Sequence, residues 1–110
     1  MKTAIIVLLI ALFTANPILA ETEITKQWHS LVEQYKTHMV VGEWSAAIQV
    51  AETLLEMVPS SSEAKFYLIY AVKKTGAKYP TWVGKPSEWA YSTVNDRFYV
   101  GLAKEISNGS

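Results

Sequence analysis

The stretch GEWSAAIQVAETLLEMVP, residues 42–59, decides the fold of this chain. Its apolar side chains recur at the spacing of one α-helical face, and they are Ala46, Ala47, Val50, Ala51, Leu54, Leu55 and Val58. Glycine favours the left-handed conformation that ends a helix, and proline cannot continue one. We therefore predict a helix over residues 43–58, bounded by Gly42 and Pro59.

The segment before Gly42 has the same periodicity. Its apolar residues lie three or four apart, at Ile24, Trp28, Leu31, Val32, Tyr35 and Met39. This spacing predicts a helix over residues 25–41. Because Gly42 leaves no room for a long loop, we expect the two helices to be antiparallel neighbours.

Two further helices are predicted after Pro59. Any of the serines at 60–62 can cap a helix start, and a helix beginning there ends at Gly76. It is apolar nearly all round, so we expect it to be central. A loop follows over residues 77–86. Ser87 then opens a fourth helix, in which apolar residues repeat every four positions, at Ala90, Val94, Phe98, Leu102 and Ile106. The predicted fold class is all-α, with about four helices in antiparallel hairpins.

Residues 28–61 resemble one whole tetratricopeptide repeat. Gly42 and Trp44 match the turn of that repeat, small residues follow where its helices approach closely, and Pro59 closes the pattern. Residues 62–76 resemble the first helix of a second repeat. Its final glycine follows Gly42 by 34 residues, which is the period of this family. The alternative is a generic four-helix bundle.

Some positions depart from the family pattern. Tyr35 replaces a small residue, Lys65 replaces a large apolar one, and Pro80 lies where the second helix of the second repeat should form. The fourth helix is then either a displaced partner helix or a capping helix. His38 also replaces an apolar residue, and we expect it to be half-buried and hydrogen-bonded.

The N-terminus is typical of a secretory signal peptide. Lys2 is followed by an apolar run over residues 4–13 and by the small-residue junction Ala20-Glu21. We predict a signal peptide over 1–20, a single helical domain over 21–110, and a periplasmic or secreted protein. The alternative is an uncleaved leader that anchors the protein in a membrane.

Composition excludes several kinds of site. The chain has no cysteine, which excludes disulfides, thiol catalysis and a lipid-attachment cysteine. Removal of residues 1–20 leaves a formal charge of −1, so no basic surface for nucleic acid is expected. Two histidines are too few for a metal site, and the carboxylates of Glu52 and Glu56 are typical of a solvated helix face. We predict no enzymatic activity, no metal and no cofactor.

The resemblance implies that the first helix of each hairpin lines a concave face that binds a protein or peptide segment. The candidate partner-binding residues are Lys36, Phe66, Tyr67, Tyr70, Lys73, Lys74 and Trp82. Alternatively, the fourth helix fills this groove, and Tyr79 and Trp82 fold over the third helix. We therefore predict an exported, non-catalytic interaction module that acts as an adaptor. The alternative is a small accessory subunit of a larger membrane-associated envelope complex. Fewer than three repeats are present, and about three are needed for a stable array, so self-association is a further alternative.

Overall fold

The computed structural model describes the backbone of residues 17–108 and the side chains of residues 22–107. The chain divides into two compact units, residues 1–30 and residues 31–110, and each is described by itself. The predicted signal peptide lies outside the described residues, apart from the backbone of its last four positions. No described helix is long and apolar enough to span a membrane.

The described part of the chain is all-α, as predicted. Its main helices are α2 (Pro17–Val40), α3 (Trp44–Met57), α4 (Ser62–Thr75) and α5 (Val94–Asn108), and the 3₁₀ helices are η1 (Thr81–Val83) and η2 (Pro86–Glu88). The main helices pack in chain order, and α3 forms antiparallel hairpins with α2 and with α4. In the first unit, the described residues form the beginning of α2. This helix begins eight residues before the predicted start, at a proline that the first helical turn tolerates.

The turn between α2 and α3 forms at the predicted glycine. Gly42 has a φ of +79°, which a side chain would disfavour, and its N–H donates to the carbonyl oxygen of Met39 at 3.3 Å. Glu43 then precedes the first residue of α3, and its Oε1 lies 2.8 Å from Nδ1 of His38. His38 is half-buried and hydrogen-bonded, as expected.

Neighbouring serines at the start of α4 have different roles. The Oγ of Ser61 accepts a hydrogen bond from the N–H of Ala64 at 3.0 Å and caps the helix. Ser62 is fully buried, and its Oγ donates to the carbonyl oxygen of Ala90 at 2.7 Å. Gly76 ends α4 with a φ of +79°. The start of α4 is therefore bonded to the loop that precedes α5.

The fourth main helix begins at Val94, so the predicted start at Ser87 was wrong. Ser87 lies in the short η2, which Pro86 opens. Trp89 follows in an extended conformation and is buried, and its Nε1 donates to the carbonyl oxygen of Val83 at 2.8 Å. The chain is not helical from Trp89 to Thr93. The Oγ1 of Thr93 then accepts a hydrogen bond from the N–H of Asp96 at 2.9 Å.

The buried face of α5 also differs from the predicted one. Val94 and Phe98 belong to the expected apolar stripe but are 75% and 58% exposed. Val100 and Ala103 are buried instead. The apolar residues spaced four apart predicted the wrong buried face of α5. The side that is buried is the one that contacts α4 and η2.

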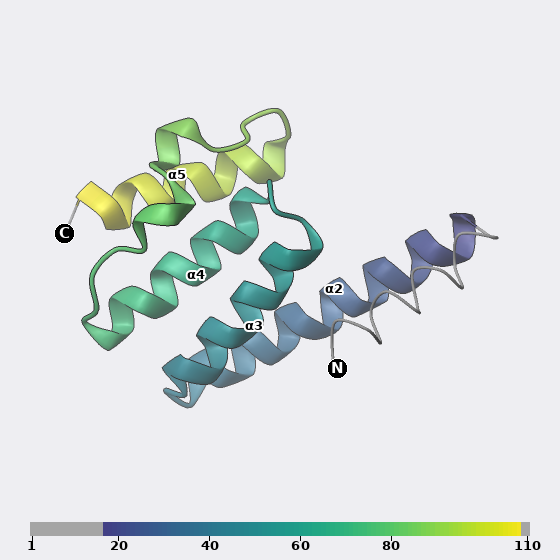
Figure 1. Cartoon of the computed structure of the whole chain (residues 1–110), viewed down its shortest axis with the longest axis horizontal. Coiled ribbons are helices and arrows are strands. Elements are labelled where there is room, and N and C mark those ends of the chain that lie inside the picture. Colours follow the sequence, from purple (N-terminus) through teal and green to yellow (C-terminus); the bar gives the residue numbers. More distant parts are fainter. Residues whose placement is uncertain (1–16, 109–110) are drawn as a thin grey trace. The chain divides into compact units, whose positions relative to one another are not determined.

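Helices α4 and α5 run in the same direction. Their contacts join residues at a nearly constant separation, namely Glu63 with Asn95, Tyr67 with Tyr99, and Lys73 with Ile106, at 32, 32 and 33 residues. Figure 1 shows α4 between α3 and α5, with the loop and 3₁₀ turns crossing back before α5 begins. These two helices are therefore not a hairpin, because residues 76–93 return the chain to the starting end of α4.

The same separation links α2 to α4. The Oη of Tyr35 donates to the backbone oxygen of Tyr67, 32 residues later, at 2.7 Å. Tyr35, Tyr67 and Tyr99 thus stand at equal intervals on α2, α4 and α5. Helix α3 connects the first two, and the segment with η1 and η2 connects the last two.

Candidate functional site

An aromatic cluster joins three helices in the second unit. It consists of Tyr35 on α2, Phe66, Tyr67 and Tyr70 on α4, and Tyr99 on α5. The rings of Tyr35 and Tyr67 stack with centroids 4.5 Å apart, and those of Phe66 and Tyr70 stack at 5.6 Å with an interplanar angle of 10°. The ring of Tyr99 lies 5.6 Å from both Phe66 and Tyr67. The ring contacts of Tyr67 with Tyr35 and Tyr99 join α4 to α2 and to α5.

Tyr67 is the centre of this cluster and is 6% exposed. Its Oη donates to Oε2 of Glu63 at 2.5 Å, so the hydroxyl of Tyr99, 3.2 Å away, donates to Tyr67. Glu63 also accepts from Nδ2 of Asn95 at 3.1 Å. Burial and these hydrogen bonds raise the pKa of Tyr67 well above its ordinary value. Tyr67 is therefore a neutral core group that bonds α4 to α5.

Other members of the cluster reach the surface. Phe66, Tyr70 and Tyr99 are half-buried. The Nζ of Lys74 lies 5.3 Å from the centroid of the Tyr70 ring, and Phe98, which is largely exposed, meets Tyr99 edge-on at 5.1 Å. These five residues, which we call the aromatic face, present flat apolar surface beside a cation.

The structure brings only part of the predicted partner-binding set together. Tyr70, Lys74 and Phe66 share the aromatic face, with Tyr67 buried behind it. The remaining predicted residues lie elsewhere.

Lys73 and Lys36 are each engaged by other groups. The Nζ of Lys73 donates to the carbonyl oxygen of Ile106 at 3.1 Å, which joins α4 to α5. The Nζ of Lys36 lies 3.6 Å from Oε2 of Glu33 on the same helix. Both lysines are exposed.

Trp82 lies on η1 and is 66% exposed. The expected alternative, in which Tyr79 and Trp82 both cover α4, does not hold for Trp82, and Tyr79 is itself 37% exposed. The Oη of Tyr79 donates to the carbonyl oxygen of Gly84 at 2.7 Å. The buried residues of this loop are instead Val83, Pro86 and Trp89.

Lys65 is explained by the same loop. Its Nζ lies 5.8 Å from the centroid of the Trp89 ring, a distance at which a cation is attracted to an indole face. A lysine can therefore stand where the repeat pattern has a large apolar residue.

Tyr99 and Phe98 belong to the aromatic face but were not predicted. The interval from Tyr35 to Tyr67 repeats from Tyr67 to Tyr99, and this spacing could have identified Tyr99. The four-residue stripe assigned Phe98 to the core, and the structure exposes it.

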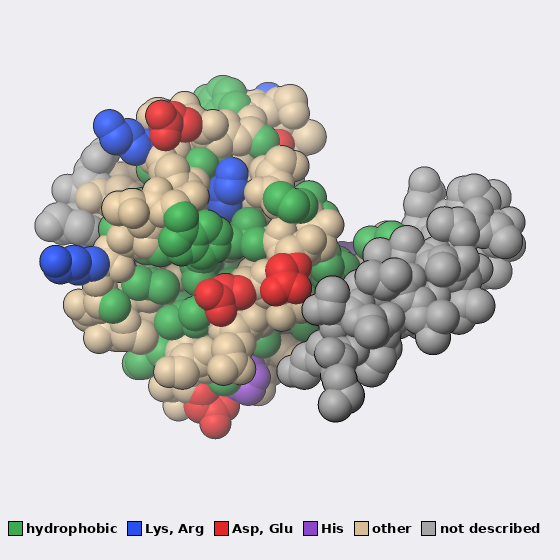
Figure 2. Space-filling model, viewed as in Figure 1, with side chains coloured by type: hydrophobic (Ala, Val, Ile, Leu, Met, Phe, Trp, Pro, Cys, Tyr) green, Lys and Arg blue, Asp and Glu red, His purple; other side chains and the backbone are tan. Residues whose placement is uncertain are grey.

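The charges and apolar groups are distributed unevenly on the surface that Figure 2 shows. Hydrophobic side chains gather over α4 and the segment around η1, while acidic side chains lie over α3. Among the described residues, no group of three or more His, Asp or Glu side chains could hold a metal ion. The face drawn in Figure 2 therefore offers apolar contact area over α4 and the segment around η1.

No family model, no curated protein and no solved structure matches this chain.

Proposed function

We propose that this protein is an exported tetratricopeptide-like module that binds a protein or peptide segment without performing chemistry. The observation that carries the proposal is the aromatic face, where the stacked rings of Phe66 and Tyr70 lie beside Lys74. Aromatic side chains give large rigid contact area, and they dominate the binding free energy at the centres of interfaces.

The relationship to tetratricopeptide repeats is supported by the order of the helices. Helices α2, α4 and α5 follow one another at a 32-residue interval, close to the 34-residue period of that family. Ala47 and Ala51 of α3 are fully buried, as small residues are where repeat helices approach closely. In this proposal α5 takes the position of the first helix of a third repeat and acts as a capping helix.

The partner that fits this face is an apolar segment with an acidic residue. Its apolar side chains would lie on Phe66 and Tyr70, and its carboxylate would meet Lys74. A helix or an extended strand can present such groups at regular intervals. An exposed cation at the rim mainly sets the association rate and its salt dependence, so most of the affinity should come from the rings.

The second candidate is an accessory subunit docked permanently in a larger membrane-associated complex. Val40 and Val41, at the end of α2 and just after it, are 84% and 62% exposed, and exposed apolar groups that lie together are typical of contact sites. In both proposals residues 1–20 direct export, and the protein is periplasmic or secreted. Retention of the leader as an anchor, or self-association, would fit the subunit.

Tyr70→Ala tests the binding face. The wild-type protein is used to capture a partner from the envelope and exported fractions, and the captured segment is then titrated against each variant. We expect Tyr70→Ala to weaken binding by about 2 kcal/mol, roughly thirtyfold, with little change in melting temperature. Lys74→Gln should cost less and should flatten the salt dependence.

Tyr91→Ala is the matched control, because Tyr91 is 58% exposed and its ring lies beside Arg97. It should bind the partner as the wild type does. A large loss of melting temperature in Tyr70→Ala would assign Tyr70 to the core, and the binding face would then be abandoned. Sedimentation separates the two candidates, since an adaptor sediments as a monomer and an obligate subunit associates.

A further inference from the structure

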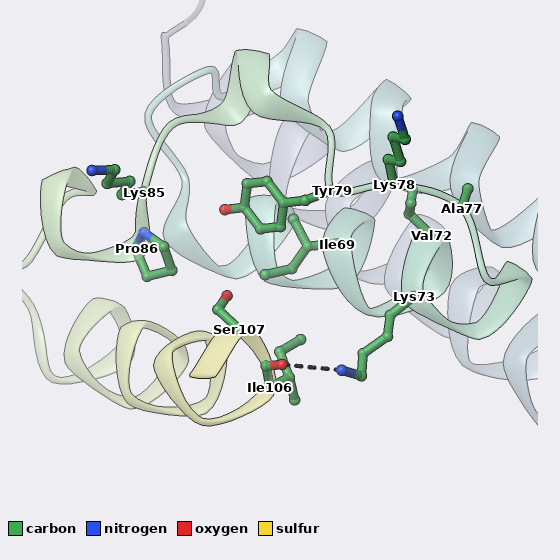
Figure 3. A pocket seen from close by; sticks show the side chains of 10 residues that line it. All are labelled: Ile69, Val72, Lys73, Ala77, Lys78, Tyr79, Lys85, Pro86, Ile106 and Ser107. Atoms are coloured by element: carbon green, nitrogen blue, oxygen red, sulfur yellow. Dashed lines mark hydrogen bonds between the residues drawn. The ribbon is translucent and has the colours of Figure 1, made fainter. Parts of the chain in front are cut away.

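A cavity of about 460 Å³ opens between α4, the loop after it and the end of α5 (Figure 3). Its walls are mainly apolar, and they include Ile69, Val72, Pro86 and Ile106. The volume lies within the range of small-molecule sites, about 300–1,000 Å³. All of its lining residues belong to the second unit. The cavity is separate from the aromatic face.

One polar atom in the cavity has no partner. The Oγ of Ser107 is buried and makes no hydrogen bond with the described residues. Figure 3 shows this oxygen directed from α5 towards the space below Tyr79. A buried hydroxyl without a partner is unfavourable, so the cavity wall is not wholly apolar at this point.

The charged residues of the lining are all lysines, namely Lys73, Lys78 and Lys85. Helices α4 and α5 both end here, and each C-terminus carries about half a negative elementary charge. The Nζ of Lys73 donates to a carbonyl oxygen in the last turn of α5, so this one ammonium group offsets the two helix ends. The charge of the other two lysines remains.

Lys78 and Lys85 stand at the rim. In Figure 3 their amino groups lie outside the cavity, on opposite sides of it. A lysine stem is long and flexible, so either group can turn towards a bound anion. Glu88 accepts a hydrogen bond from the backbone N–H of Lys85 at 3.0 Å and places a carboxylate near that residue. Lys78 is therefore the better anion contact.

We propose that this cavity binds a medium-chain aliphatic carboxylate. Its hydrocarbon chain lies along Ile69, Val72 and Ile106, and its carboxylate lies at the rim by Lys78. The ligand class follows from an apolar wall, a cationic rim and a lining without Asp or Glu. The inference does not depend on the proposed partner surface, since the two sites share no residue.

Calorimetric titration of the full chain with decanoate, below its micelle-forming concentration, tests the proposal. We expect one saturable site. Each methylene added from octanoate to decanoate should tighten binding about fourfold, which corresponds to about 0.8 kcal/mol. Decanol should bind at least about tenfold more weakly, because it keeps the chain and loses the charge. Decylamine should be weaker still.

Variants localise the site. Ala77 is an exposed lining residue in the loop, so Ala77→Phe fills the cavity from its edge and should abolish binding without unfolding the protein, as circular dichroism will check. Lys78→Gln should weaken decanoate about tenfold and leave decanol unchanged. Lys104→Gln, on an exposed position of α5 outside the lining, is the matched control. All variants keep the apolar run at residues 4–13. Any binding of decanoate to that run is therefore the same in every variant and does not affect the comparison.

Three results would each overturn the proposal: no saturable binding of decanoate, equal affinity for decanol, or wild-type affinity in a folded Ala77→Phe variant.

Discussion

At the residue scale, the two glycines with the clearest consequences are Gly42 and Gly101. Gly42 has a φ of +79°, and a Cβ there would lie 3.7 Å from the Trp44 side chain, so backbone strain decides the effect of a substitution. Gly101 lies inside α5 with open space around it. Glycine therefore stabilises the turn at position 42 and weakens helix α5 at position 101.

Gly42→Val should destabilise the domain by about 1–2 kcal/mol, because a β-branched residue is strained at positive φ. Gly101→Ala is the matched control and should stabilise it by about 0.5–1 kcal/mol, because alanine loses less backbone entropy in a helix. Urea unfolding measures both. Equal stability of the Gly42→Val variant and the wild type would contradict the assigned turn.

Tyr35 and Tyr67 make stability depend on alkaline pH. Burial raises the pKa of Tyr35 above its ordinary value of 10.0, and burial together with the hydrogen bonds of Glu63 and Tyr99 does so for Tyr67. In the unfolded chain both phenols lose their protons near pH 10, whereas the folded protein keeps them. Their contribution is therefore complete below pH 10 and is lost as the pH rises above it.

We expect the melting temperature to fall as the pH rises above about 10. Lysines also titrate in this range, so the comparison is with Tyr35→Phe, which keeps the ring and lacks the ionisable hydroxyl. The variant should start from a lower stability, since it loses the hydrogen bond to the backbone of Tyr67. Its stability should then decline less steeply with pH. Parallel curves would refute the role of Tyr35.

At the element scale, α3 is a helix whose position depends on close packing. Ala47 and Ala51 are fully buried. Their small size was predicted to allow close approach, and the burial agrees. A larger side chain at either position has no space to occupy without moving a helix.

Ala47→Leu should cost about 1–3 kcal/mol, because the added carbons overpack the contact. Gln49→Leu places the same side chain on an exposed position of α3 and should change stability by no more than about 0.5 kcal/mol. Thermal unfolding followed by circular dichroism compares them. If both variants melt together, the packing assigned to α3 is incorrect.

Sequence patterns predicted the first three helices well and the fourth poorly, for physical reasons. Gly42, Pro59 and Gly76 act locally, since each restricts the backbone where it stands, and the helices end beside them. The start of α5 depends on Trp89, whose indole is held by a carbonyl six residues earlier. The periodicity of apolar residues carries no information about that contact. In the sequence, Ser87 is as suitable a helix cap as Thr93.

The aromatic face was predictable in part for a similar reason. Phe66 and Tyr70 stand on a helix whose first turn and last turn were both marked in the sequence. Tyr99 joins them only because α5 runs parallel to α4. The sequence did not predict that direction, because a long connection follows Gly76. Local patterns therefore identified one side of the face, and packing supplied the other.

At the scale of the whole molecule, the proposed signal peptide can be tested directly. Cleavage after Ala20 should give an exported protein that starts at Glu21, because the apolar run at residues 4–13 is too short for an ordinary membrane span. Intact-mass measurement of the exported protein checks it. A mass that still contains residues 1–20 would support an anchored protein instead.

The crossing of residues 76–93 affects the order in which the domain assembles. The α3 hairpins close through short turns, so their contacts are near in sequence and cost little chain entropy to form. The contacts of α5 with α4 join residues 32 or 33 apart, and they form only after the intervening segment has returned to the start of α4. Contacts of that range slow folding. We therefore expect α3 and α4 to pair before α5 docks, in which case the aromatic face is completed late in folding.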